Sequence, residues 1–270
     1  MKNSLKKVTT FLIINFMLSS TFYYLIIKGS LSVILSLGLM WVPAVSSIIT
    51  QLIFNKNIKG FGWKLGKIKY LAISYFIPFF ACLMVYGIVW ITGIGGVSFH
   101  RLSELYHRPI GTVILMIPTI IFAFNFIAAL GEEIGWRGFL TSELLKDYSY
   151  VKTSMIVGVI WFAWHCPIII FSTYNVEGTP IWYNLLMVFI SMIAITFVTV
   201  WIKIKSGSLW TAAILHASHN MFSQFVFDVI AINYGITKYI TTEFGFGLAF
   251  VYTMIGIYCL RKNRNQELCK

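Results

Sequence analysis

Long apolar runs recur along nearly the whole chain, and they limit its possible folds more than any other feature. Each run has about twenty residues, enough for a helix to cross a hydrocarbon core of about 30 Å. Of the 270 residues, 58% are hydrophobic and only 11% are charged, whereas roughly a quarter are charged in an ordinary soluble domain. No stretch has the alternating pattern of a membrane barrel strand. The sequence therefore predicts an all-α polytopic membrane protein.

The runs predict a bundle of about eight transmembrane helices in a single membrane domain, residues 1–270. The first run lacks a small-x-small cleavage site, so we expect a retained span rather than a signal peptide. No loop is long enough to form a soluble domain, and we therefore expect the function to reside in the bundle. The expected spans are 8–28, 31–54, 70–93, 111–131, 153–173, 181–202, 208–231 and 244–260.

The basic residues predict the orientation of these spans. If both termini are cytoplasmic, seventeen of the 21 Lys and Arg residues fall on the cytoplasmic side, and Lys28, Arg101, Arg108 and Lys238 fall on the other. Membrane proteins show this bias toward cytoplasmic positive charge. The net charge of +12 therefore indicates topology in a cell membrane and requires no nucleic-acid partner. The Lys-rich loop 55–69 is also suited to anionic lipid.

Ionisable side chains within the spans are the first candidates for function, because each is costly in a bilayer unless it is paired or hydrated. The first three spans carry essentially none. Spans four, five and seven contribute acidic, imidazole and amide groups to one bundle. These are Glu132, Glu133 and Arg137 at the end of span four, His165 in span five, and His216, His219 and Asn220 in span seven.

The segment 131–138 is expected to continue the fourth helix beyond its apolar stretch. Glu133 and Arg137 would then be i and i+4 neighbours and form an ion pair. Glu132 would point about 100° away and lack a local partner, as suits a carboxylate that accepts and returns a proton. The glycines of the segment would let another helix approach closely. Alternatively, the three charges only cap the helix at the interface.

The histidines of spans five and seven have both functional and structural interpretations. Pro167 is expected to bend the helix beside His165 and free a carbonyl there. His216 and Asn220 share one helix face, with His219 near its edge, so this stripe cannot face lipid. Alternatively, all these side chains serve only as hydrogen bonds between helices.

This set of residues permits hydrolysis of an amide. A carboxylate and one histidine can activate water, while a second histidine and an amide can stabilise an oxyanion. Glutamate and two histidines can also hold zinc, so a zinc site stays open. The chain has no H-E-x-x-H and no G-x-S-x-G, and its four cysteines include no C-x-x-C pair. A zincin helix, a serine nucleophile and a cysteine zinc ribbon are therefore not indicated.

Three motifs together resemble the signature of the CPBP (Abi) family of CAAX-protease and bacteriocin-processing membrane proteins. The motifs are Glu132-Glu133 with Arg137, Trp161 four residues before His165, and His216 four residues before Asn220. The resemblance covers about residues 111–225, which we expect to form the catalytic core. The second motif usually begins with Phe, and we interpret Trp161 as a difference of packing rather than of chemistry.

The resemblance implies an intramembrane endopeptidase of eight helices whose catalytic cavity opens to the cytosol. No cofactor is expected, although zinc stays possible because members are often described as metalloproteases. The resemblance implies that Glu132 is the general base and that His165 acts with it on the water. It implies that His216 and Asn220 stabilise the oxyanion. Glu133 and Arg137 would form a supporting ion pair.

The expected substrate is a hydrophobic or membrane-anchored peptide or protein. The resemblance links bacterial members to bacteriocin or peptide maturation and to immunity, and the richness of this chain in Lys, Asn and Ile favours a bacterial origin. Two alternatives remain. The protein could be a non-catalytic immunity or scaffold protein, or a proton-coupled transporter, because buried Glu and His also form proton relays.

Overall fold

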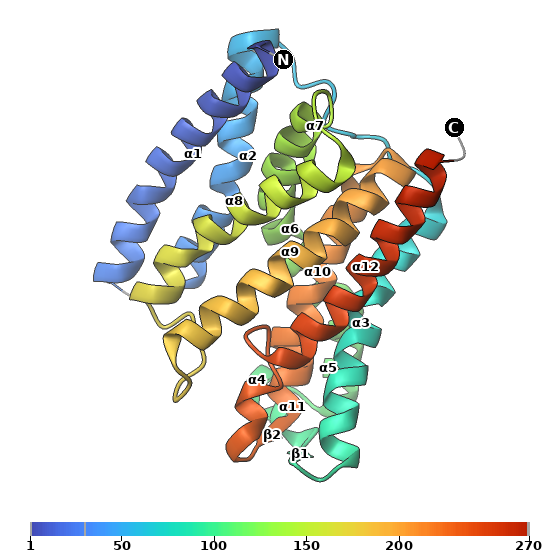
Figure 1. The fold of residues 1–270 in the computed structure, drawn as a ribbon. Coiled ribbons are helices and arrows are strands. Elements are labelled where there is room, and N and C mark those ends of the chain that lie inside the picture. Colours follow the sequence, from blue (N-terminus) through green and yellow to red (C-terminus); the bar gives the residue numbers. More distant parts are fainter. Residues whose placement is uncertain (1, 30, 269–270) are drawn as a thin grey trace.

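The computed structural model describes residues 2–29 and 31–268, and Figure 1 shows long helices packed side by side. Cys269 and Lys270 lie outside the described residues. The predicted all-α membrane fold is confirmed, because six helical segments among the described residues are long and apolar enough to cross a membrane. They are α1 (Lys2–Lys28), α2 (Val33–Asn55), α3 (Ile68–Ile91), the continuous helix Ile110–Leu144, α8 (Tyr150–Phe171) and α9 (Ile181–Ser206).

The outer faces of these helices expose large apolar side chains. Ile34, Leu115 and Ile91 are 81%, 72% and 89% exposed. Exposure of these apolar side chains to water would cost free energy, whereas in a bilayer they contact lipid tails. The outer surface therefore suits the membrane location that the composition predicts.

The last two predicted spans are also helical but lie outside this group of six. The seventh consists of α10 (Leu209–Asn220), the π-helix η3 (Met221–Phe227) and the short α11 (Asp228–Ile230), and the eighth is α12 (Phe246–Leu268). The seventh carries polar side chains along one face, and the last turns of α12 are rich in charged residues. The count of eight spans therefore stays a prediction.

Hydrogen bonds at the helix ends fix where three cavity-forming helices begin. Ser32, Ser149 and Ser208 precede α2, α8 and α10, and each hydroxyl accepts a hydrogen bond from a backbone N–H of the first turn. Such N-caps satisfy donors that a helix start leaves unpaired. Gly207 ends α9 in the left-handed conformation, with φ of 67°, which glycine adopts without steric cost.

The fourth predicted span continues past the two glutamates, as expected for the segment 131–138, and ends only at Leu144. It consists of α5 (Ile110–Met116), η1 (Ile117–Ile121), α6 (Phe122–Glu133), η2 (Ile134–Leu140) and α7 (Thr141–Leu144), of which η1 and η2 are π-helical.

Helix α2 packs directly against this helix, as the glycines predict. A Cβ atom on Gly131 would lie 2.7 Å from the carbonyl oxygen of Met40, and one on Gly135 would lie 2.4 Å from Cβ of Pro43. No side chain fits at either position, so the two glycines allow α2 to approach.

The two ends of the bundle carry different connections. Helix α1 begins and α12 ends at the same end, where the chain also passes from α2 to α3 (Figure 1). At the other end, β1 (Gly95–Val97) pairs antiparallel with β2 (Ala231–Asn233), near α4 (His100–Tyr106) and the 3-10 helix η4 (Gly235–Tyr239).

Candidate active site

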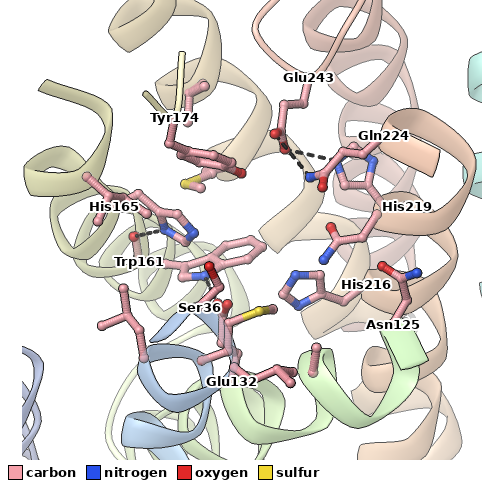
Figure 2. Close-up of a pocket in the computed structure, with 18 of the residues that line it drawn as sticks. Ser36, Asn125, Glu132, Trp161, His165, Tyr174, His216, His219, Gln224 and Glu243 are labelled. Atoms are coloured by element: carbon pink, nitrogen blue, oxygen red, sulfur yellow. Dashed lines mark hydrogen bonds and ion pairs between the residues drawn. The ribbon is translucent and has the colours of Figure 1, made fainter. Parts of the chain in front are cut away.

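A cavity of about 380 Å³ lies among the helices. Its wall is formed by parts of α2, α6, α8, α9, α10, η3 and α12 and by the connections that precede α2, α9 and α12. All four residues predicted to be catalytic line it: Glu132, His165, His216 and Asn220. Figure 2 shows the first three around the cavity, together with polar side chains that the sequence did not single out.

Glu132 has one oxygen bound and one oxygen free. Its Oε2 accepts hydrogen bonds from the indole nitrogens of Trp161, at 2.7 Å, and Trp136, at 3.3 Å. The expectation that Glu132 lacks a local partner is therefore wrong, because Trp136 lies one turn further along the same helix. Among the described residues, Oε1 accepts no hydrogen bond. That oxygen is left for a water molecule or a substrate.

Trp161 contributes more than packing, so our interpretation of this departure from the family pattern is wrong. Its indole N–H donates to Glu132, which a phenylalanine could not do. The guanidinium carbon of Arg137 lies 4.1 Å from its ring centroid, within the range of a cation–π contact. The ring also packs edge-on against His216, at a centroid distance of 5.3 Å. It packs edge-on against His165 as well, at 5.8 Å, so Trp161 contacts four of the predicted site residues.

Glu133 points away from the cavity and binds two neighbours. Its Oε1 accepts from Nη1 of Arg137 at 2.7 Å, which confirms the predicted ion pair, and both side chains are fully buried. The same oxygen accepts from Nδ1 of His216 at 2.9 Å, a contact that the sequence did not predict. Glu133 thus orients His216 and leaves Nε2 as the ring nitrogen that can meet a ligand.

His165 has a tautomer fixed by its neighbour. Its Nδ1 lies 2.9 Å from the carbonyl oxygen of Trp161. A carbonyl only accepts hydrogen bonds, so Nδ1 carries the proton and Nε2 of the neutral ring carries a lone pair. Because His165 lines the cavity, this nitrogen can accept a proton or a hydrogen bond there.

Asn220 and His219 lie on the cavity wall beside His216. Within the described chain, the amide of Asn220 makes no side-chain hydrogen bond, so it is free to donate to a ligand. Nδ1 of His219 lies 2.8 Å from the hydroxyl of Tyr252, which holds this ring against α12.

The donor groups do not assemble into a metal site. Among residues 2–29 and 31–268, no group of three or more His, Cys, Asp or Glu side chains is arranged to hold a metal ion. Nδ1 of His216 and Oε1 of Glu133 already bind each other. Binding of zinc by His165, His216 and a glutamate, which the sequence left open, stays a prediction for metal analysis.

Glu243 is a cavity residue that the sequence analysis missed. It lies in the connection between η4 and α12, one residue before the last predicted span, where a charge suggests an exposed loop. Its Oε1 accepts a hydrogen bond from Nε2 of Gln224 at 3.0 Å, and Tyr174 lies beside it. Its Oε2 lies 4.0 Å from Nε2 of His219. Nothing in the local sequence indicated that this loop turns into the bundle.

The cavity extends away from the end that holds the chain termini. Its lining continues from Glu132 to Leu31, Ser32 and Val33, where α1 and α2 are joined. That connection lies opposite the start of α1 and the end of α12 (Figure 1). Cytoplasmic termini and a cavity that opens to the cytosol were both expected, and both stay predictions.

The comparisons with known proteins agree with the motif analysis. Residues 113–222 match the family model described as Type II CAAX prenyl endopeptidase Rce1-like. A curated protein named CAAX prenyl protease 2, from Methanococcus maripaludis, is 33% identical over 99 residues, which are 35% of this chain and 36% of that protein. The similarity thus spans about a third of the relative. The family resemblance is confirmed for a segment that contains all four predicted catalytic residues.

Proposed function

Because residues 113–222 match the model of the Rce1-like family of CAAX prenyl endopeptidases, we propose that this membrane protein is an endopeptidase that cuts within the bilayer. The substrate is a hydrophobic or membrane-anchored peptide or protein. One observation supports this most: a free carboxylate oxygen, an imidazole nitrogen with a lone pair, a second imidazole and a free amide all line one cavity.

We assign water activation to Glu132 and His165. Oε1 of Glu132 accepts a proton from a water molecule, and Nε2 of His165 accepts a hydrogen bond from the same water. The water oxygen then bonds to the carbonyl carbon of the peptide. Proton transfer by positioned groups of this kind contributes typically about 10²- to 10⁴-fold to a rate.

We assign stabilisation of the oxyanion to His216 and Asn220. The tetrahedral intermediate carries a negative oxygen, to which Nε2–H of His216 and the amide N–H of Asn220 donate. Donation from Nε2 requires His216 to be protonated on both nitrogens, and its contact with Glu133 favours that charge. When the carbon–nitrogen bond breaks, the proton held by Glu132 passes to the leaving amine.

Glu133 and Arg137 act on this site through His216 and Trp161. Arg137 donates to Glu133 and also to the hydroxyls of Thr196 and Thr199, both at 3.2 Å, so its position is fixed by α9. These contacts orient the two rings that border the cavity. The pair therefore supports the catalytic groups without contacting the substrate.

The first experiment asks whether the protein cuts peptides at all. Membrane peptidomes of cells that express the wild type or Glu132→Gln identify candidate substrates, which are then supplied to the purified protein in lipid nanodiscs. We expect cleavage to fall by at least about 100-fold in Glu132→Gln. Glu177→Gln, which changes an exposed carboxylate outside the cavity, is the matched control.

Other results would favour the alternative functions. If Glu132→Gln cuts as fast as the wild type, the proposed chemistry is wrong. Binding of a peptide by the wild type without cleavage would indicate an immunity or scaffold protein. Uptake driven by a proton gradient and lost in Glu132→Gln would indicate a transporter.

The proposed location of the protein is a bacterial cell membrane, with both termini in the cytoplasm.

A further inference from the structure

The acidic and basic side chains that line the cavity are glutamates and histidines. Its lining includes the carboxylates of Glu132 and Glu243 and the rings of three histidines, but no Lys or Arg among the described residues. Arg137, although close to Glu132, binds Glu133 and does not line the cavity. A carboxylate on a substrate would therefore meet two carboxylates and no permanent cation. The wall at Glu243, away from the proposed oxyanion site of His216 and Asn220, therefore disfavours anionic groups on a ligand.

Glu243 is built into the wall opposite the catalytic groups. Figure 2 shows it across the cavity from Glu132 and His216. Gln224 and Tyr174 hold its carboxylate, and both are neutral hydrogen-bond partners. The nearest ring nitrogen, Nε2 of His219, lies 4.0 Å away, which is too far for a hydrogen bond. Among the described residues, Glu243 is thus a carboxylate held in a fixed position without a Lys or Arg that balances its charge, and the ring of His219 lies at the outer limit of an ion pair.

The cost of this arrangement points to a missing partner. The side chain of Glu243 is only 17% exposed. Burial raises the pKa of its carboxyl, because the ionised form loses contact with water. A carboxylate in such surroundings is strongly stabilised when a cation enters and completes an ion pair with it. Among the described residues, the protein itself provides no Lys or Arg at this wall.

We propose that Glu243 is a specificity residue that binds a cationic group of the substrate, close to the peptide bond that is cut. The group is a Lys or Arg side chain or a free amino terminus. This inference rests on the proposed endopeptidase function. The remainder of the wall, including Val188, Met192 and Phe225, is apolar and suits hydrophobic residues around the cationic one.

The test uses synthetic peptides that differ at one residue. A hydrophobic peptide taken from an identified substrate carries Lys, Arg, Gln or Glu at each position near the cleavage site in turn, and cleavage is measured in nanodiscs. At one position we expect kcat/KM for Lys or Arg to exceed that for Gln by at least tenfold, mainly through KM, and Glu to be worst. Peptides with free and acetylated amino termini separate the two sources of charge.

Substitution of Glu243 then assigns the preference to this residue. In Glu243→Gln we expect the ratio of kcat/KM between the cationic and the Gln peptide to fall to about one. Glu243→Lys should prefer the Glu peptide. Glu177→Gln should keep the wild-type ratio, because its carboxylate lies outside the cavity. Thermal unfolding of each variant identifies those that do not fold, and Glu243→Gln alone is sufficient for the test.

The possible failures are distinguishable. If the wild type cuts the Gln peptide and the cationic peptides equally well, Glu243 is not a specificity residue and the endopeptidase proposal stands. If Glu243→Gln keeps the full preference for cationic peptides, another group binds the cationic side chain and the inference is wrong. If the wild type cuts none of the peptides, including the identified substrate, the endopeptidase proposal fails and the inference fails with it.

Discussion

The contact of Glu133 with Arg137 and His216 gives the sharpest test of the roles assigned to the two adjacent glutamates. Glu133→Gln keeps the size of the side chain but removes its negative charge. Arg137 is fully buried, and its remaining side-chain partners would be the hydroxyls of Thr196 and Thr199 and the ring of Trp161. Loss of one partner from a buried ion pair costs about 3–5 kcal/mol. We expect Glu133→Gln to lower the free energy of unfolding by that amount.

A second substitution separates the lost charge from other effects. The double variant Glu133→Gln with Arg137→Gln removes both charges and leaves no permanent ion unpaired, because His216 can give up its proton. Because neutral replacement of a whole buried pair is often nearly neutral for stability, we expect it to be at least about 2 kcal/mol more stable than Glu133→Gln alone. Glu132→Gln should change stability by less than about 1 kcal/mol, since its amide oxygen can still accept from both indoles.

Reversible unfolding in mixed micelles, titrated with SDS and followed by tryptophan fluorescence, measures these differences. Cleavage is measured on the same preparations. If the double variant loses as much free energy of unfolding as the two single variants together, Arg137 is not left as an unpaired charge in Glu133→Gln. If Glu132→Gln mainly destabilises while Glu133→Gln only inactivates, the two roles are reversed.

Three further predictions use other contacts. Trp161→Phe removes the shorter hydrogen bond to Glu132, at 2.7 Å, and we expect cleavage to fall about tenfold in a folded protein; unchanged cleavage would restore the packing interpretation. Active purified protein should contain no stoichiometric zinc and keep its activity in a membrane-permeant chelator, whereas activity that is lost on chelation and restored by zinc would contradict this. A cysteine introduced near Lys64 should react with membrane-impermeant reagents added on the cytoplasmic side, and cysteines at Ser32 and Tyr234 with reagents added outside. Labelling of Ser32→Cys from the cytoplasm would mean that the predicted orientation is reversed. The cavity would then extend toward the cytosol.

The features that the sequence predicts well depend on short separations along the chain. Apolar runs of about twenty residues predict helices because no other isolated segment satisfies its backbone in lipid. Glu133 and Arg137 pair because four residues are about one helical turn. Gly131 and Gly135 predicted a close neighbour for the same reason, since they recur on one face of a helix. The identity of that neighbour, α2, could not be predicted.

Contacts between distant segments explain what the sequence analysis missed. Trp161 is 29 residues from Glu132, and His216 is 83 residues from Glu133. Helical periodicity indicates which face a side chain occupies but not which helix it meets. The indole donor to Glu132 was therefore interpreted as packing, and the carboxylate partner of His216 was not predicted. Glu243 was missed because hydropathy places it in a loop, although that loop turns into the cavity.

Adjacent positions on one helix explain how two glutamates can differ in function. Successive residues of a helix are about 100° apart, so two neighbours cannot face the same surroundings. Glu132 faces the cavity with Oε2 bound by indoles and Oε1 free, whereas Glu133 faces Arg137 and His216 and has no access to the cavity. A group that transfers protons to a substrate must reach it, and a group that orients a histidine must stay fixed. Access to the cavity, rather than the chemical nature of the side chain, is therefore the reason why we propose one glutamate for the reaction and the other for its support.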